Sequence, residues 1–218
     1  MIEKYKHVIW DWNGTIFNDV QLGVDIVNKM LLPRKLPTLT VETYRDTFTI
    51  PVKNYYERIG FDFSKESFEM LGKHWMDEYE SRKFECGLYK GVVDLMEKIS
   101  SHGIGQSILS AYSQHTLEEM VDHYGLRKYF HHIVGLDNIY AAGKLHLGIE
   151  LMNRLGNARP AGSKLGKGET LLIGDTVHDY EVASEIGADC VLIANGHQSK
   201  KILEKCGVPV FNNIKEIV

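Results

Sequence analysis

Three aspartates in this sequence of 218 residues stand in local settings that suit chemistry on phosphate. Asp11 directly follows the apolar run at 8–10, while Asp175 and Asp179 lie four residues apart in the segment GDTVHD. An aspartate at the end of a strand can attack phosphorus and form an aspartyl phosphate, which divides one difficult step into two. Mg²⁺ prefers carboxylate and water ligands in octahedral geometry. Asp11 and Asp175 could therefore share a divalent cation, each supplying one oxygen.

Ser110 and Lys144 could bind the oxygens of a phosphoryl group. Ser110 ends an apolar segment and is followed by Ala111, and its hydroxyl and the neighbouring backbone N–H groups could hold phosphate oxygens. Lys144 precedes an expected helix, where its ammonium could balance the charge of phosphate and carboxylate groups.

Each of these residues also has an ordinary structural explanation. Asp11 could form a turn, and Asp175 or Ser110 could cap a helix that follows it. Lys144 taken alone would be a solvated surface lysine. The case for chemistry therefore depends on whether the fold brings the residues together.

The elements that must position these residues alternate along most of the chain. The expected strands are 7–10, 105–109, 131–135, 170–173, 190–194 and 208–211, and the expected helices are 91–102, 113–124, 145–155, one that ends near 187, and 199–205. Such alternation is typical of a parallel sheet with helices on both faces. Ligands bind these sheets at the carboxyl ends of the strands, where Asp11, Ser110 and Asp175 are expected to converge.

The segment that follows the first strand has a different pattern. Apolar residues recur at helical spacing over 20–32 and 66–79, prolines interrupt the region, and no alternating strand pattern occurs in it. We therefore expect an α/β fold whose core is a doubly wound, Rossmann-like parallel sheet formed by residues 1–17 and 87–218. Residues 18–86 are expected to form a small helical domain inserted into that core.

Four segments carry a family resemblance when they are taken together. They are DWNGT at 11–15, ILSA at 108–111, AAGK at 141–144 and GDTVHD at 174–179. In order and separation they resemble the four motifs of the haloacid dehalogenase (HAD) superfamily, and more closely its phosphoglycolate-phosphatase-like branch, over nearly the whole chain. The resemblance implies a helical cap inserted after the first motif, and a phosphoric monoester hydrolase (EC 3.1.3 class) that uses Mg²⁺ as its cofactor.

The resemblance also implies roles for individual residues. Asp11 would be the covalent nucleophile, and the metal ligands would be Asp11, Asp175 and the backbone carbonyl of Asn13. Asp179 would support these ligands without binding the metal itself. Lys144 would hold phosphate oxygens together with the residues of the second motif.

Asn13 departs from the family pattern, because most of the family's phosphatases have Asp at this position. That Asp protonates the leaving oxygen and then helps to activate the water that cleaves the aspartyl phosphate, whereas an amide has no titratable proton near neutral pH. General acid–base catalysis is typically worth ~10²–10⁴-fold in rate. We expect Asn13→Asp to raise the turnover of an alkyl phosphate ester at least about tenfold.

Three explanations for Asn13 remain open. The enzyme could favour substrates with good leaving groups, such as acyl phosphates, which need little protonation. His178 or the substrate itself could carry the proton. Alternatively, the protein is a slow enzyme or a phosphate-binding regulator without catalysis.

Two other groups of enzymes in the superfamily also lack an Asp at the position that Asn13 occupies here. Haloacid dehalogenases use no metal, but they have no comparable Gly-Asp pair at the fourth motif, so that Gly174-Asp175 favours the metal enzyme. Phosphonate hydrolases use a Schiff-base lysine of the cap, for which Lys29, Lys35 and Lys53 are the candidates.

The helical insertion would limit access by macromolecules, so we expect the substrate to be a small phosphorylated metabolite. Arg45, Lys53 and Arg58 could meet an anionic group of that substrate, and Tyr55 and Tyr56 could line its pocket. The sequence does not identify the metabolite.

The composition argues against several classes of partner. The formal net charge of -4 argues against nucleic acid, and no stretch approaches the length needed to span a bilayer, so no membrane partner is expected. The three cysteines form no CxxC pair, which favours reduced thiols in a cytoplasmic protein. The oligomeric state is left open by the sequence.

Overall fold

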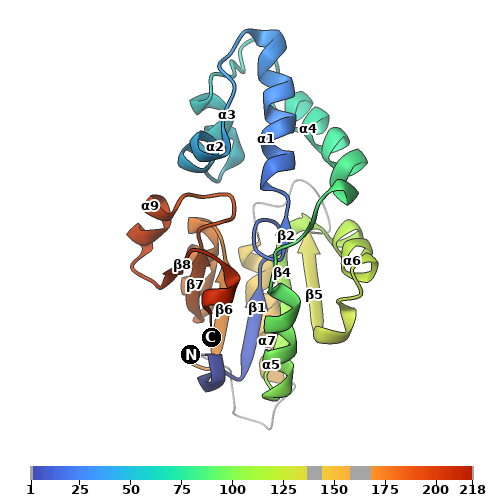
Figure 1. Cartoon of the computed structure of the whole chain (residues 1–218), viewed down its shortest axis with the longest axis vertical. Helices are drawn as coiled ribbons and strands as arrows, with labels where there is room; N and C mark the ends of the chain where they lie inside the picture. Colours follow the sequence, from blue (N-terminus) through green and yellow to red (C-terminus); the bar gives the residue numbers. More distant parts are fainter. Residues whose placement is uncertain (1, 137–143, 158–167, 218) are drawn as a thin grey trace.

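The computed structural model describes residues 2–136, 144–157 and 168–217. Six strands form one parallel sheet in the order β5-β4-β1-β6-β7-β8, which confirms the expected α/β class (Figure 1). The strands are β1 (His7–Trp10), β4 (Gly105–Ser113), β5 (His132–Leu136), β6 (Thr170–Gly174), β7 (Asp189–Ile193) and β8 (Val210–Phe211). The helices that alternate with them are α5 (Val92–Ser101), α6 (Gln114–His123), α7 (Leu145–Asn157), α8 (Val177–Ile186) and α9 (Lys200–Leu203).

Both faces of the sheet are buried, and β1 illustrates how. Val8 and Trp10 belong to one hydrophobic core with Met96 of α5, whereas Ile9 belongs to a second core with Leu151 of α7. Successive side chains of a strand point to opposite faces, so a strand that is covered on both faces must be apolar throughout. This burial explains why the run at 8–10 is continuous rather than alternating.

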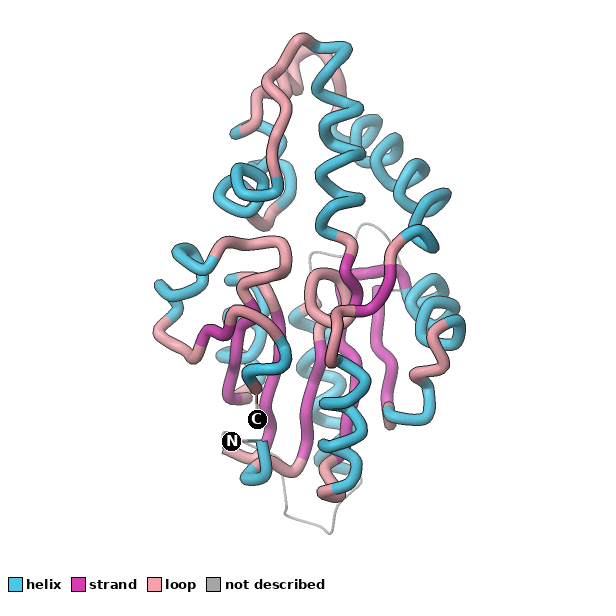
Figure 2. Tube along the Cα trace, in the orientation of Figure 1, coloured by secondary structure: helices cyan, strands magenta, loops and turns pink. Residues whose placement is uncertain are grey.

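The segment between β1 and α5 is mainly helical and lies beyond the carboxyl ends of the strands (Figures 1 and 2). Its helices are α1 (Val20–Leu31), α2 (Val41–Thr47), α3 (Val52–Arg58) and α4 (Phe68–Arg82), and we call residues 20–86 the helical unit. The chain enters and leaves this unit through β2 (Phe17–Asn18) and β3 (Gly87–Leu88), which pair antiparallel. Among the described residues, no helix combines the length and apolar character that a membrane crossing requires.

The prediction that the second strand ends at Ser110 is wrong. β4 continues to Ser113, and its register against β5 shifts between Leu109 and Ser113. A bulge of this kind leaves residues of one strand without a partner in the ladder and bends that strand. Ser110 and Ala111 therefore lie inside an irregular part of β4, a departure that periodicity does not reveal.

Candidate active site

The register of the central strands brings Asp11 and Asp175 to the same edge of the sheet. Trp10, the last residue of β1, pairs with Ile173 of β6, and the backbone N–H of Asp11 donates to the carbonyl of Ile173 at 2.9 Å. Asp175 follows two residues later, just past the end of β6. Two residues that are 164 positions apart in the sequence thus meet because their strands are parallel neighbours.

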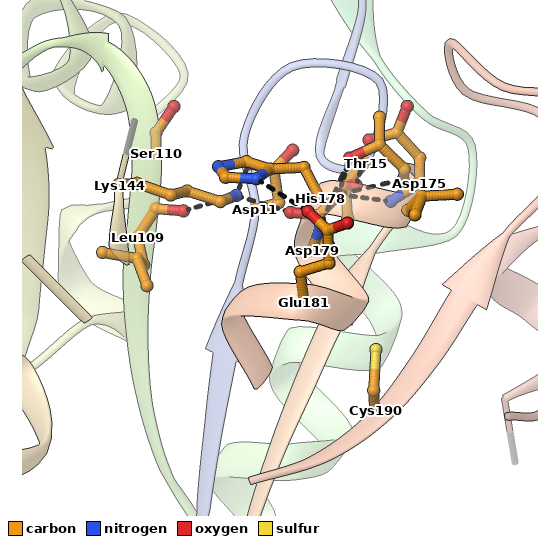
Figure 3. A network of polar contacts seen from close by, with 12 residues as sticks. Asp11, Thr15, Leu109, Ser110, Lys144, Asp175, His178, Asp179, Glu181 and Cys190 are labelled. Carbon is orange, nitrogen blue, oxygen red and sulfur yellow. Dashed lines mark hydrogen bonds and ion pairs between the residues drawn. The ribbon is translucent and has the colours of Figure 1, made fainter. Parts of the chain in front are cut away.

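The carboxylates of Asp11, Asp175 and Asp179 gather into one buried cluster (Figure 3). Each residue offers an oxygen atom, and these atoms lie within 4.8 Å of one another. An oxygen-only donor set of this kind suits a hard divalent cation such as Mg²⁺. The chemistry of the cluster therefore fits the metal that the family resemblance implies.

Lys144 supplies the positive charge of this cluster. Its ammonium donates to Asp11 Oδ1, to Asp179 Oδ1 at 2.5 Å and to the carbonyl of Leu109 at 3.2 Å. Burial alone would lower the pKa of Lys144, but the carboxylates of Asp11 and Asp179 outweigh that effect and raise it above its ordinary value. Lys144 is therefore a charged partner within the cluster. The residues Ala141–Gly143 of the third motif lie outside the described part of the chain.

Asp179 is held by the start of α8. Its Oδ2 accepts hydrogen bonds from the backbone N–H groups of Asp175 (3.1 Å) and Thr176 (2.9 Å) and from the Thr176 hydroxyl (2.6 Å). Thr176 is the N-cap and forms a capping box with Asp179, so the alternative in which Asp175 caps this helix is wrong. Burial would raise the pKa of Asp179, yet Lys144 and these hydrogen bonds bring it below its ordinary value.

Asp175 is fixed by Thr15 of the first motif and by a loop at 196–197 that the sequence did not single out. Its Oδ1 accepts from the hydroxyl of Thr15 at 3.1 Å, and its Oδ2 accepts from the backbone N–H of His197 at 2.6 Å. A Cβ added at Gly14 or Gly196 would lie 2.3 or 2.2 Å from Asp175 Oδ2, so both close approaches require glycine. Burial raises the pKa of Asp175 to about 6.

Asn13, Asp19 and Tyr79 form a second polar cluster beside the first. The Asn13 amide donates to Asp19 Oδ2 at 2.8 Å and to the Tyr79 hydroxyl at 2.7 Å, and that hydroxyl donates to Asp19 Oδ2 at 2.8 Å. Asp19 is not expected from the sequence to be part of the site, because an aspartate before a helix is normally explained as its N-cap. Asp19 does occupy the N-cap position of α1, but its side chain makes no capping hydrogen bond.

His197 links the two clusters. Its Nε2 lies 3.2 Å from Asp19 Oδ1, while its backbone N–H binds Asp175 as described above. Burial would lower the pKa of His197, but the neighbouring carboxylate of Asp19 raises it to about 9. His197 lies shortly after the end of β7. Its position could have been suspected from the sequence because ligands of parallel sheets bind at the carboxyl ends of strands.

A cavity of about 330 Å³ lies between these clusters and the helical unit. The residues of the sheet side that line it include Asp11, Asn13, Asp19, Ser110, Ala111, Lys144, Asp175, His178, Asp179 and His197. Tyr55 and Tyr56 line it from the helical unit, as expected, whereas Arg45, Lys53 and Arg58 do not. The fold thus brings together every candidate residue from the motifs, but not the cations proposed for an anionic substrate.

The comparison with protein families identifies the class of the chain. A family model described as haloacid dehalogenase-like hydrolase matches residues 8–193. The chain therefore belongs to the haloacid dehalogenase-like hydrolases, which confirms the family resemblance and the hydrolase class that it implies.

Solved structures with the same fold are numerous. A structure described as a "predicted phosphatase" from Clostridium acetobutylicum has a TM-score of 0.78 and 18% identity, with 98% of this chain and 96% of that chain covered. A structure described as a "predicted phosphoglycolate phosphatase" from Haemophilus somnus has a TM-score of 0.72 and 16% identity, with the same coverage of both chains. At these identities the likeness establishes the fold.

A curated relative has a different description. The tyrosine-protein kinase PtkA of Mycobacterium tuberculosis is 22% identical to this chain over 154 residues, which are 70% of this chain and 50% of PtkA. The chain thus spans about half the length of the curated relatives it matches.

Proposed function

We propose that the chain is a Mg²⁺-dependent phosphatase of the phosphoglycolate-phosphatase-like type, which hydrolyses a small phosphorylated metabolite through an aspartyl phosphate on Asp11. The observation that carries this proposal is the buried cluster of Asp11, Asp175 and Asp179 around Lys144, at the strand ends and open to a cavity. Three carboxylates with a single lysine leave an excess of negative charge, which a divalent cation would balance.

Each residue of the cluster has a part in the proposed reaction. Asp11 attacks phosphorus, while the Lys144 ammonium orients its carboxylate and neutralises charge on the phosphoryl oxygens. Asp11, Asp175 and the backbone carbonyl of Asn13 would hold the metal, and Asp179 would fix Lys144. Bound Mg²⁺ would offset the charge that develops on phosphate.

Ser110 and Ala111 would complete the binding of the phosphoryl group. The Ser110 hydroxyl oxygen accepts a hydrogen bond from the backbone N–H of Tyr112 at 3.1 Å, so its own hydrogen can be donated to a phosphate oxygen. The backbone N–H of Ala111 would bind a second oxygen. Residues 18–86 would act as a cap that excludes water from the strand ends during the reaction.

A colorimetric assay with p-nitrophenyl phosphate tests the proposal, because nitrophenolate leaves without a general acid. We expect activity that requires Mg²⁺ and is abolished by Asp11→Asn. Phosphate binding without turnover would instead favour the non-catalytic phosphate-binding protein, and halide release without metal would favour a dehalogenase. Phosphonate hydrolysis has little support, because Lys29, Lys35 and Lys53 do not line the cavity.

The name of the curated relative brings a second candidate, which is phosphoryl transfer to a tyrosyl oxygen. The observation that favours it is the set of aromatic side chains that line the same cavity as Asp11 and could receive a phenol ring. Incubation with radiolabelled ATP and Mg²⁺ tests this candidate. Alkali-stable label on tyrosine would favour the kinase, whereas release of free phosphate alone would favour the hydrolase.

A further inference from the structure

The wall of the cavity that the helical unit contributes is apolar. Among residues 20–86, all of which the structure describes, no charged side chain lines the cavity. We call the lining rings the aromatic wall; its members are Tyr44, Phe48, Tyr55, Tyr56, Phe68, Trp75 and Tyr79. Val27, Ile50, Val52, Gly72 and Met76 complete this side of the cavity.

The rings of the aromatic wall are packed against one another. Tyr55 lies with its ring centroid 5.7 Å from that of Tyr44 and 5.3 Å from that of Phe48, and Trp75 stacks on Tyr79 at 4.8 Å with an interplanar angle of 17°. Rings that support each other in this way form a preformed surface. Such a surface is complementary to a flat apolar group, which it can contact by stacking or edge-to-face packing.

Two arginines of the helical unit that could have met an anionic substrate are engaged elsewhere. The Arg45 guanidinium donates to the carbonyls of Asn195 (2.5 Å) and Gly196 (2.8 Å), and the Arg58 guanidinium donates to the carbonyl of Thr47 at 3.0 Å. A second anionic group on the substrate, such as the carboxylate of phosphoglycolate, would face an aromatic wall that contains no cation, and His197 at the edge of this wall is already paired with Asp19 at 3.2 Å. Burying an unpaired charge is strongly unfavourable.

We propose that the substrate is an aryl phosphate, whose phosphoryl group binds at Asp11 while its ring lies against the aromatic wall. The proposal rests on the proposed phosphatase function and specifies its substrate class. A bond forms between an Asp11 oxygen and phosphorus as the bond between phosphorus and the phenolic oxygen breaks. The electron pair leaves with the phenolate, which takes a proton from water, and a second water then cleaves the aspartyl phosphate to release inorganic phosphate.

This substrate class also accounts for the absence of an acid at position 13. A phenol has a pKa of about 10, as the tyrosine side chain does, so phenolate leaves far more readily than an alkoxide and needs no proton from the enzyme. The loss of the family's acid is therefore least costly for an aryl ester. Two independent features, the aromatic wall and the amide at position 13, thus point to the same leaving group.

The test compares kcat/KM for 2-naphthyl phosphate, phosphoglycolate and acetyl phosphate with Mg²⁺ present. Acetyl phosphate has a good leaving group but no ring, so it reports on the phosphoryl site alone. We expect kcat/KM to be at least about 100-fold higher for 2-naphthyl phosphate than for phosphoglycolate. Equal values would overturn the aryl proposal and leave the phosphatase intact, whereas failure to hydrolyse any of the three would overturn both.

Variants of α4 separate the aromatic wall from the phosphoryl site. Gly72 lines the cavity and a Cβ added there meets nothing within 4 Å, so Gly72→Leu should narrow the cavity without straining the helix backbone. We expect it to lower kcat/KM roughly tenfold more for 2-naphthyl phosphate than for acetyl phosphate. Lys73→Leu adds leucine to the solvent side of the same helix and should leave both values unchanged. An equal loss for both substrates in Gly72→Leu would count against the aromatic wall as the binding site.

A charge placed in the wall provides the converse test. Met76 lines the cavity and is 37% exposed, so Met76→Arg can be tolerated without burying the guanidinium. We expect it to raise kcat/KM for phosphoglycolate and lower it for 2-naphthyl phosphate. No change in the ratio of the two values would overturn the assignment of this surface to the leaving group.

Discussion

The Asn13 side-chain amide donates a hydrogen bond of 2.8 Å to Asp19 Oδ2, and the hydroxyl of Tyr79 bonds to both side chains. An amide thus stands where most phosphatases of the family carry an acid, and a carboxylate stands next to it. The other oxygen of Asp19 accepts from the backbone N–H of Gly14 at 3.0 Å. Exchanging the two residues would reverse all three hydrogen bonds among these side chains: the amide nitrogen at position 19 would donate to the carboxylate at position 13 and to the Tyr79 hydroxyl, and that hydroxyl would donate to position 13. The amide oxygen at position 19 could still accept from the backbone N–H of Gly14.

The double variant Asn13→Asp/Asp19→Asn should therefore restore a general acid whose hydrogen-bond partners are still present, although it removes the carboxylate that pairs with His197. We expect kcat for an alkyl phosphate ester to rise at least about tenfold, since general acid–base catalysis is worth ~10²–10⁴-fold. The kcat for p-nitrophenyl phosphate should change much less, because its leaving group needs no proton. Steady-state kinetics on both esters measure the difference.

The single variant Asn13→Asp is the matched control for the exchange. It would place two carboxylates next to each other in a buried site, which is unfavourable unless one of them is protonated. We expect its midpoint of thermal unfolding to lie below that of the double variant. Equal alkyl phosphate turnover in the wild type and the double variant would mean that another group already carries the proton.

Prediction from the sequence succeeded where geometry follows from strand order. Asp11 and Asp175 each follow a buried apolar run, and parallel neighbouring strands must deliver such residues to a common edge. Asp19 and Tyr79 escaped prediction because they are joined only by the packing of α4 against α1, over a separation of 60 residues. No local pattern encodes that contact.

The lining of the cavity could not be predicted from the periodicity of the sequence either. Helical spacing marks aromatic residues such as Phe68, Trp75 and Tyr79 as facing inward, but it does not distinguish a packed core from the lining of a cavity. The same limitation applies to Arg45, whose charge suggested a substrate contact although its guanidinium in fact binds the carbonyls of a neighbouring loop. The side-chain contacts in the structure are needed to distinguish a core residue from a cavity residue, or a substrate contact from an internal hydrogen bond.

Metal binding should stabilise the folded protein. Folding assembles the cluster of Asp11, Asp175 and Asp179, so the proposed Mg²⁺ should bind the native state preferentially. At a free Mg²⁺ concentration of about 100 times Kd, linkage gives about 2.7 kcal/mol, which corresponds to a rise in Tm of roughly 5–10 °C for a chain of this size. Differential scanning fluorimetry after chelation and repletion measures the shift. Asp175→Asn should abolish it, and a shift that persists in this variant or is reproduced by KCl at equal ionic strength would contradict the assigned site.

The glycine at position 196 should be necessary for the position of Asp175. A Cβ there would lie 2.2 Å from Asp175 Oδ2, so Gly196→Ala must displace the carboxylate. Changes behind a metal ligand typically weaken metal binding by roughly 10- to 100-fold, and we expect a loss of this size in Mg²⁺ affinity by titration. Gly87→Ala is the control, because a Cβ at Gly87 meets nothing within 4 Å. An unchanged affinity in Gly196→Ala would show that Asp175 does not need to be held where the structure has it.

Removing Lys144 should affect both stability and catalysis, whereas removing another buried lysine should affect stability alone. Lys144→Met leaves Asp11 and Asp179 buried without their cation, and breaking a buried ion pair in this way costs about 3–5 kcal/mol.

Lys83 is the matched control, because it is a buried lysine that does not line the cavity. Its ammonium donates to Glu80 at 2.9 Å and to Glu119 at 2.7 Å. We expect Lys83→Met to lose less stability, because its acidic partners still reach solvent, and to keep its kcat. Urea denaturation in chelator and kcat with Mg²⁺ measure the two effects, and a Lys144→Met enzyme that folds and retains kcat would remove Lys144 from the proposed mechanism.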